Sequence, residues 1–161
     1  MRHLMPVRTR GLTLIELMVA LAIASMLMLA AMPYFGEYTA NSRLRESGNT
    51  VYTDALLAQS EAIKRNRLVR LASNGSRIQV LDLSNPDSPV VLRERVLEGV
   101  TTDTLSIDFG SAGRPVPFGT TGALDFSMSG QTCSGDVRCP GLRIDAGGGV
   151  RLCGNRLDNC S

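Results

Sequence analysis

The sequence contains little histidine, lysine or aromatic side chain, and these shortages limit its chemistry. One of 161 residues is histidine, four are phenylalanine, three are tyrosine and none is tryptophan. The one histidine, His3, lies within the first eleven residues. Removal of that segment would leave no imidazole for Ser–His–Asp or Cys–His catalysis or for histidine-ligated zinc. Lys64 is the only lysine. We therefore expect a protein that is not an enzyme and that has no metal or cofactor.

The formal net charge of +2 is not evenly distributed along the chain. Three of the seventeen basic residues, Arg2, Arg8 and Arg10, lie in the first eleven positions, and no acidic residue does. Without them fourteen basic residues remain against fifteen acidic ones, a net charge of −1. Bulk charge therefore does not favour nucleic-acid binding by residues 12–161, and this length has room for one modest domain.

A long uncharged run follows the basic segment. Residues 17–32 carry no charge, and Ser25 is their only polar residue. Counted from Leu12, the run gives about 21 helical residues, or roughly 30 Å, enough to cross a bilayer core. Glu16 lies inside it, where a carboxylate costs at least a few kcal/mol unless it is paired. Cleavage after Gly11 would create an ammonium on Leu12, and in neighbouring subunits this group could pair with Glu16.

Two ordinary explanations of this N-terminus are an uncleaved membrane anchor and a secretory signal peptide cleaved further along. An acid within the apolar segment argues against the signal peptide. The positive flank predicts that the N-terminus stays in the cytoplasm while the rest of the chain crosses the inner membrane into the periplasm.

The basic segment, Gly11, Glu16 and the unbroken apolar helix resemble the class III signal of type IV prepilins and pseudopilins. The wider pattern, through Arg43-Leu44-Arg45 and residues 59–66, resembles the GspH/FimT branch of minor pilins. The resemblance implies an α+β pilin fold, with a long N-terminal helix packed on a mostly antiparallel sheet. It also implies cleavage after Gly11 by a prepilin peptidase and N-methylation of residue 12, which is Leu here and usually Phe in the family.

The resulting division of the chain has four parts. We expect a leader at residues 1–11, a transmembrane and filament-core helix at 12–33, the amphipathic half of the same helix at 34–66, and a β-rich periplasmic head at 67–161. Pro33 is expected to kink the helix.

Helical periodicity predicts which face of the second half of the helix is buried. The expected apolar stripe consists of Leu44, Gly48, Val51, Ala55 and Ala62. The charged residues nearby are expected on the remaining surface; they are Arg43, Arg45, Glu46, Asp54, Glu61 and Lys64.

From residue 68 the pattern changes to the alternation typical of strands. Asn74-Gly75 predicts a hairpin turn between the first two strands. The expected strands are residues 68–71, 77–81, 90–93, 105–109, 123–128, 142–145 and 150–153.

All four cysteines follow residue 130, which suits an oxidising compartment and a disulfide-tied C-terminal region. They allow three connectivities. We expect the local pairs Cys133/Cys139 and Cys153/Cys160, with crossed pairing as the alternative. Their spacing does not match a zinc knuckle.

A DNA-binding element is a second hypothesis for the C-terminal region. Some FimT-like minor pilins bind DNA through a Gly-Arg-x-Arg element on the final strand, and residues 148–151 resemble it with the first arginine replaced by Gly149. Arg143, Arg151 and Arg156 are the candidate residues. The glycines at 147–149 open no helix, so a hairpin turn is expected there and not a nucleotide-phosphate loop.

These features predict a minor type IV pilin or pseudopilin, a structural subunit that helps to start or cap a type IV pilus. A DNA-binding minor pilin of the natural-transformation machinery and a GspH-like pseudopilin of type II secretion are the alternatives. The expected partners are other pilin subunits through the N-terminal helix, the prepilin peptidase, and the inner membrane before assembly, with DNA as a further possibility.

Overall fold

The described residues form one helix and eight strands. The computed structural model describes residues 13–158 and 160, and it separates into two compact units, residues 1–36 and 37–161. Helix α1 (Leu14–Arg65) runs through both. We call residues 14–31 the arm and residues 37–161 the head. The backbone is helical across Pro33, and the predicted kink there stays a prediction.

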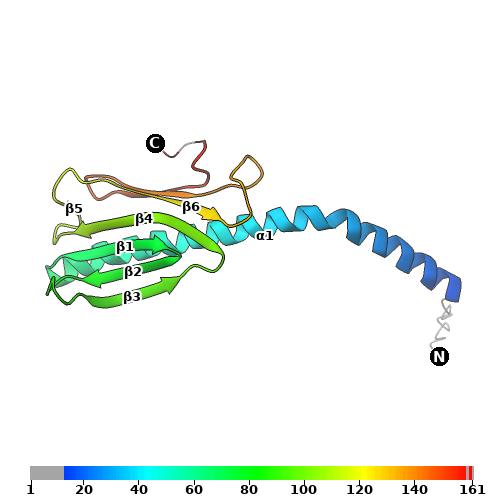
Figure 1. Cartoon of the computed structure of the whole chain (residues 1–161), viewed down its shortest axis with the longest axis horizontal. Coiled ribbons are helices and arrows are strands. Elements are labelled where there is room, and N and C mark those ends of the chain that lie inside the picture. The colour runs from blue at the N-terminus through cyan, green and yellow to red at the C-terminus, as the bar shows by residue number, and fades with distance from the viewer. Residues whose placement is uncertain (1–12, 159, 161) are drawn as a thin grey trace, which may run out of the picture. The chain divides into compact units, whose positions relative to one another are not determined.

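The head contains a single antiparallel sheet (Figure 1). Its strand order is β3-β2-β1-β4-β6-β7-β8, and β5 pairs only with β4. The α+β class with a mostly antiparallel sheet, predicted from the sequence, is therefore confirmed. The strands are β1 (Val69–Gly75), β2 (Arg77–Asp82), β3 (Val90–Val96), β4 (Val100–Phe109), β5 (Pro115–Val116), β6 (Gly122–Met128), β7 (Gly141–Ile144) and β8 (Val150–Cys153).

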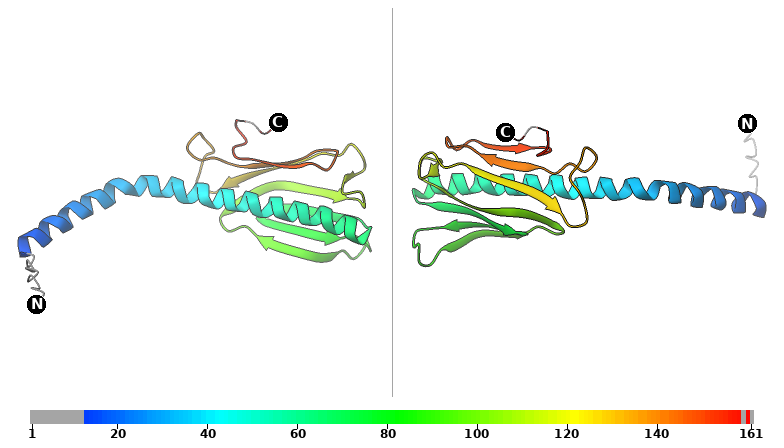
Figure 2. Two further views of the ribbon diagram at one scale, coloured as in Figure 1. Left: turned by 180° about the vertical axis from the view of Figure 1, so that it is seen from behind. Right: turned by 45° about the horizontal axis from the view of Figure 1, so that its top comes forward.

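The part of α1 inside the head crosses one face of this sheet (Figure 2). The predicted stripe forms the contact: Leu44, Val51, Ala55 and Ala62 are fully buried. Ala55, Ala58 and Ala62 are small and fully buried, so the helix backbone can lie close against the sheet at these positions. Large side chains fill the opposite side of this core, among them Leu71, Ile107, Phe109, Phe126 and Leu142.

Gly48 lies where the helix packs tightly against the β7–β8 side of the head. A Cβ atom at this position would lie 3.2 Å from Leu152 Cδ1 and 3.2 Å from Pro140 Cγ. Glycine lowers helix stability by about 1 kcal/mol relative to alanine, so its place in this buried stripe is explained by the lack of room.

Asp54 corrects one expectation. Sequence periodicity placed it on the polar surface, but it is buried, with 1% of its surface exposed. Arg93 and Arg95 of β3 both reach it, with Nη1–Oδ1 and Nε–Oδ2 distances of 3.3 and 3.1 Å. A buried carboxylate requires such partners, and these lie about forty residues away in the sequence, where a helical pattern does not reveal them. The pair links α1 to the sheet edge.

The end of α1 is set by Asn66, which has a φ of 52°. Its N–H donates to Ile63 O, and the N–H of Arg67 donates to Ala62 O. This arrangement is the Schellman motif, in which a residue in the left-handed region satisfies the last carbonyls of a helix. The chain then enters β1, and the predicted hairpin joins β1 to β2; because Asn74 pairs with Arg77, its turn residues are Gly75 and Ser76, one position later than predicted.

Substitution of Gly48 tests the close approach. We expect Gly48→Leu to destabilise the head by about 1–3 kcal/mol, because extra carbons would be forced against Pro140 and Leu152. Thermal unfolding of the full chain in detergent, followed by circular dichroism, measures the effect. Gly36→Leu is the matched control, since nothing lies within 4 Å of a Cβ atom there. Equal melting temperatures for the two variants would contradict the explanation.

Candidate functional site

The start of α1 holds Glu16 in a defined hydrogen-bonding arrangement. Thr13 donates from its backbone N and from Oγ1 to Glu16 Oε2, each at 3.0 Å. Glu16 N in turn donates to Thr13 Oγ1 at 3.3 Å. This is a capping box, in which two residues satisfy each other's backbone groups at a helix N-terminus. Glu16 is thus the acid of the apolar segment and also the third helical residue of this capping box, in which Thr13 is the N-cap.

Thr13 is a residue that the sequence analysis did not identify. The signal was present, because Thr13-Leu14-Ile15-Glu16 has the Thr-x-x-Glu spacing of a capping box. Among the described residues, both hydrogen bonds to the Glu16 carboxylate go to Oε2 and none goes to Oε1. Gly11 and Leu12, the predicted cleavage and methylation positions, lie outside the described residues.

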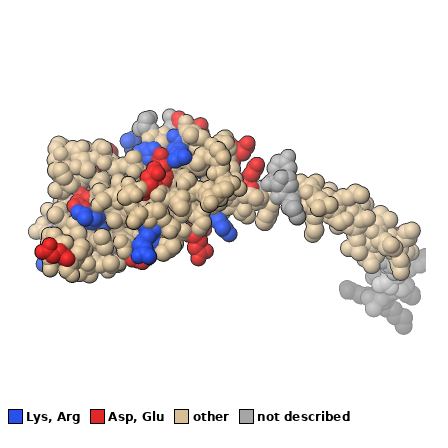
Figure 3. Space-filling view, in the orientation of Figure 1, with Lys and Arg blue, Asp and Glu red and all other residues tan. Residues whose placement is uncertain are grey.

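The arm has no partner within the described chain. Every residue from Leu14 to Ala31 is exposed, and this segment has a mean hydropathy of 2.4, sufficient in length and composition to cross a membrane. Ser25 donates its hydroxyl to Ala22 O at 2.8 Å, so this polar group is satisfied inside the helix. In the visible face of Figure 3 the charged side chains lie over the head. A surface of this kind requires lipid or other apolar helices around it.

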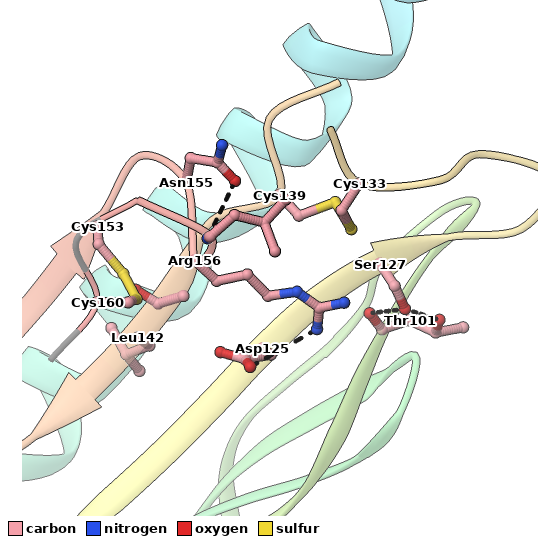
Figure 4. A network of polar contacts seen from close by, with 12 residues as sticks. Thr101, Asp125, Ser127, Cys133, Cys139, Leu142, Cys153, Asn155, Arg156 and Cys160 are labelled. Atoms are coloured by element: carbon pink, nitrogen blue, oxygen red, sulfur yellow. Dashed lines mark hydrogen bonds and ion pairs between the residues drawn. A yellow bond between two sulfur atoms is a disulfide. The ribbon is translucent and has the colours of Figure 1, made fainter. Parts of the chain in front are cut away.

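Two disulfides tie the C-terminal region. Cys133 pairs with Cys139 and Cys153 pairs with Cys160 (Figure 4), so the local connectivity predicted from the sequence is confirmed. The first closes a loop before β7, and the second returns the tail to β8. No group of three or more metal-binding side chains occurs within residues 13–158 and 160.

The loop closed by Cys133 and Cys139 is further fixed to α1. Asn41 donates from Nδ2 to Asp136 O at 2.7 Å and accepts from Arg138 N at 2.8 Å. Within the loop, Ser134 Oγ accepts the N–H groups of Asp136 and Val137. Val137 is also buried, so the loop is held by this apolar side chain as well as by its hydrogen bonds to Asn41. We call residues 133–139 the disulfide loop.

The three candidate DNA-binding arginines lie on the sheet face away from α1. Arg143 and Arg151 are directly opposite each other in the β7–β8 ladder. Arg143 Nη1 lies 2.7 Å from Asp125 Oδ1, and Arg156 Nη1 lies 3.6 Å from Asp125 Oδ2 (Figure 4 shows Arg156 and Asp125). The structure therefore brings all three to one region, but two of them share a carboxylate. Arg151 is exposed and makes no ion pair with the described residues.

The glycine-rich segment between β7 and β8 forms a hairpin turn. Asp145 Oδ1 accepts the N–H groups of Gly147 and Gly149 at 2.9 and 2.8 Å. A carboxylate thus occupies the donors that a phosphate would need. Gln59 of α1 donates to Gly113 O at 3.0 Å and also to Gly148 O, which fixes this turn against the helix and the β4–β5 connection.

Removal of the first disulfide tests the construction of the disulfide loop. We expect Cys133→Ser with Cys139→Ser to lower the free energy of unfolding by about 2 kcal/mol, the loop-closure value for a cross-link of this short span. Hydrogen exchange at residues 134–138 should become faster, with little change in β1 and β2. Asn41→Ala, which keeps the disulfide, serves as the comparison and should accelerate only the exchange. Unchanged exchange in both variants would show that the loop is not held by these contacts.

Two family models match the sequence. Residues 47–156 match the type II transport protein GspH, and residues 7–32 match the prokaryotic N-terminal methylation motif. A search of the curated proteins found no match. The first match covers most of the head, and the second covers the end of the basic segment from residue 7, Glu16 and the arm.

Solved structures with the same fold come from two bacteria. The type IV minor pilin FimU of Pseudomonas aeruginosa is 18% identical, with a TM-score of 0.59 over 71% of this chain and 91% of FimU. The minor pseudopilin EpsH of the Vibrio cholerae type II secretion system is 21% identical, with a TM-score of 0.55 over 70% of this chain and 97% of EpsH. Family and neighbours are structural pilins and not enzymes.

The GspH match spans more than half of the chain and is preceded by the methylation motif on the apolar helix. The chain belongs to the GspH family and is a minor pilin or pseudopilin of a type IV pilus or type II secretion system.

Proposed function

We propose that this chain helps to start or cap a type IV pilus, into which it is built by transfer of its arm from the inner membrane to a bundle of neighbouring pilin arms. One observation carries the proposal: residues 14–31 are exposed along their whole length and apolar apart from Glu16 and Ser25. Full burial of one leucine or methionine is worth about 1.5–3 kcal/mol, so this segment does not remain in water.

Before assembly, the precursor is held in the inner membrane with its N-terminus in the cytoplasm. Arg2, Arg8 and Arg10 precede the apolar run, and basic residues stay on the cytoplasmic side. The head is then periplasmic, where its two disulfides are stable. A prepilin peptidase cuts after Gly11, and Leu12 is methylated; the methylation motif at residues 7–32 supports both steps.

Glu16 has two functions in this scheme. In the single subunit, Thr13 donates two hydrogen bonds to Oε2 and so lowers the cost of a carboxylate in an apolar environment. In the filament, the Leu12 ammonium of a neighbour pairs with the carboxylate through its second oxygen, Oε1. Lipid tails are as apolar as the arm, so apolar burial alone does not favour the filament. The ion pair and close helix packing supply the preference.

Neutralisation of Glu16 tests this step. We expect Glu16→Gln to reduce recovery of the subunit in sheared filaments by about tenfold, equivalent to losing a charge pair with a coupling energy of ~1.5 kcal/mol. Glutamine has the same side-chain shape as glutamate and can also serve in the capping box, so the variant changes the charge and not the start of the helix. Quantitative immunoblotting of filament and membrane fractions gives the ratio.

The matched control is Glu37→Gln, an exposed acid further along α1, which should leave the ratio unchanged. Mass spectrometry of the processed wild-type chain should give a methylated Leu12 as the first residue. Any other first residue, or normal recovery of the Glu16 variant, contradicts the proposal. Recovery of the chain only with the secretion apparatus, and never with pili, would favour a GspH-like pseudopilin of type II secretion.

A DNA-binding minor pilin of natural transformation is the second candidate. The observation in its favour is that Arg143 and Arg151 are direct cross-strand neighbours and that Arg156 reaches the same face. Asp125 offsets one of the three positive charges. The remaining charge is small for nonspecific binding, which depends on the number of phosphates neutralised.

DNA binding is measured directly. If this candidate is correct, the full chain in detergent shifts duplex DNA in a gel with a steep salt dependence. Arg143→Ala with Arg151→Ala then lowers the log–log salt slope by about 2, close to one unit per lost phosphate contact. Arg67→Ala with Arg77→Ala, which removes two exposed arginines elsewhere on the head, is the control. Absence of a shift at 50 mM salt excludes the candidate, provided that thermal melts show folded protein.

A further inference from the structure

Two grooves follow α1 on opposite flanks of its buried stripe. The first, about 520 Å³, is lined by helix residues 43, 46, 47 and 50 and by residues 94–98 at the end of β3. The second, about 720 Å³, is lined by helix residues 41, 45 and 49, the disulfide loop and the end of β8. At roughly 100° per residue, these two sets of helix positions point to opposite sides. Since β3 and β8 are the two edges of the sheet, each groove lies between the helix and one edge.

The charged side chains at the two grooves form a complementary set. In the β3-side groove, Glu46, Glu98 and Arg43 make no ion pair with the described residues, while Arg95 is already bound to Asp54. Glu94 is 3.9 Å from Arg77. The uncommitted groups there are therefore two carboxylates and one guanidinium.

The β8-side groove has the opposite composition. Arg45, Arg138 and Asp136 are exposed and make no ion pair within the described part of the chain. They amount to two guanidiniums and one carboxylate. Arg138 stands on the disulfide loop, whose backbone is fixed by the disulfide and by Asn41. A side chain on a rigid support loses less conformational entropy when it binds.

We propose that the β3-side groove and the β8-side groove are the two halves of one contact between copies of this chain. Glu46 and Glu98 of one head face Arg45 and Arg138 of the next head. The contact is heterologous, because the β3-side groove of one copy meets the β8-side groove of the next copy. A contact of this type does not close on itself in a dimer and extends along a helical path.

This contact rests on the proposed function, since arms gathered in one bundle bring heads together at a high effective concentration. Weak exposed charge pairs are then sufficient to choose which flanks meet, although each is worth at most about 1 kcal/mol. One consequence concerns composition: the start or cap of the filament contains at least two adjacent copies of this chain.

Photo-crosslinking of the full chain in cells tests the contact. A photoreactive phenylalanine analogue replaces Val96, an exposed residue of the β3-side groove. Two copies with different tags are expressed together. We expect a crosslink between them that maps to residues 41–49 or to residues 135–140.

Charge reversal identifies the groups responsible. Arg45→Glu with Arg138→Glu should reduce the crosslink by at least about fivefold, since attraction becomes repulsion at two positions. Addition of Glu46→Arg and Glu98→Arg to the same chain should restore it. The control is Arg67→Glu with Arg114→Glu, which makes the same change of charge at two exposed positions outside both grooves and should have no effect.

The outcomes separate this contact from the proposed function, because N-terminal processing and filament recovery are measured in the same cells. A chain that is processed and recovered in filaments but gives no copy-to-copy crosslink, or crosslinks only to a different pilin, overturns the contact alone. A crosslink that does not respond to charge reversal overturns it as well. A charge-dependent crosslink in a chain that never enters filaments supports the contact and contradicts the proposed function.

Discussion

The arm is the constraint on which this molecule depends. A helix that is apolar around its whole circumference for eighteen residues has no stable position in water and is not buried by the described part of its own chain. Lipid and a bundle of similar helices both satisfy it. The functional properties of the chain therefore follow from what makes the second environment preferable to the first. In the proposed assembly Glu16 is important for that reason, because its carboxylate is the one ionisable group of residues 14–31 and water would not screen its charge in either apolar environment.

The head is stabilised differently, by close packing of small helix residues against the sheet. Ala55, Ala58 and Ala62 are fully buried, and Gly48 leaves room for Pro140 and Leu152. The contact fixes the helix relative to both edges of the sheet. The Asp54 pairs fasten it on the β3 side, and the Asn41 hydrogen bonds fasten it on the β8 side. A rigid head of this kind presents the same surfaces to its neighbours in every subunit.

Much of this could be predicted from the sequence, because the relevant patterns are local. The spacing of Leu44, Val51 and Ala62 predicts the buried face of the helix, alternation predicts most of the strands, and Asn74-Gly75 predicts the hairpin. The two-residue strand β5 was missed, since Pro115-Val116 is too short to show alternation. Asp54 was misplaced because its partners come from a distant strand, and periodicity describes only one element at a time. The close association of Arg143 and Arg156 with Asp125 likewise depends on the β6–β7–β8 order, which no local pattern specifies.

The capping box at the start of α1 is a local pattern that also bears on the environment of the whole arm. A carboxylate at the third helical position is favourable for any helix, because it satisfies free N–H groups and lies at the positive end of the helix dipole. The same position in an apolar segment would ordinarily be unfavourable for a charge. Thr13 and the helix terminus reduce that penalty, and within residues 13–158 the hydrogen bonds to this carboxylate use Oε2 alone. Under the proposed function, such an acid is tolerated in lipid before assembly and can still accept a new donor from a neighbouring subunit afterwards.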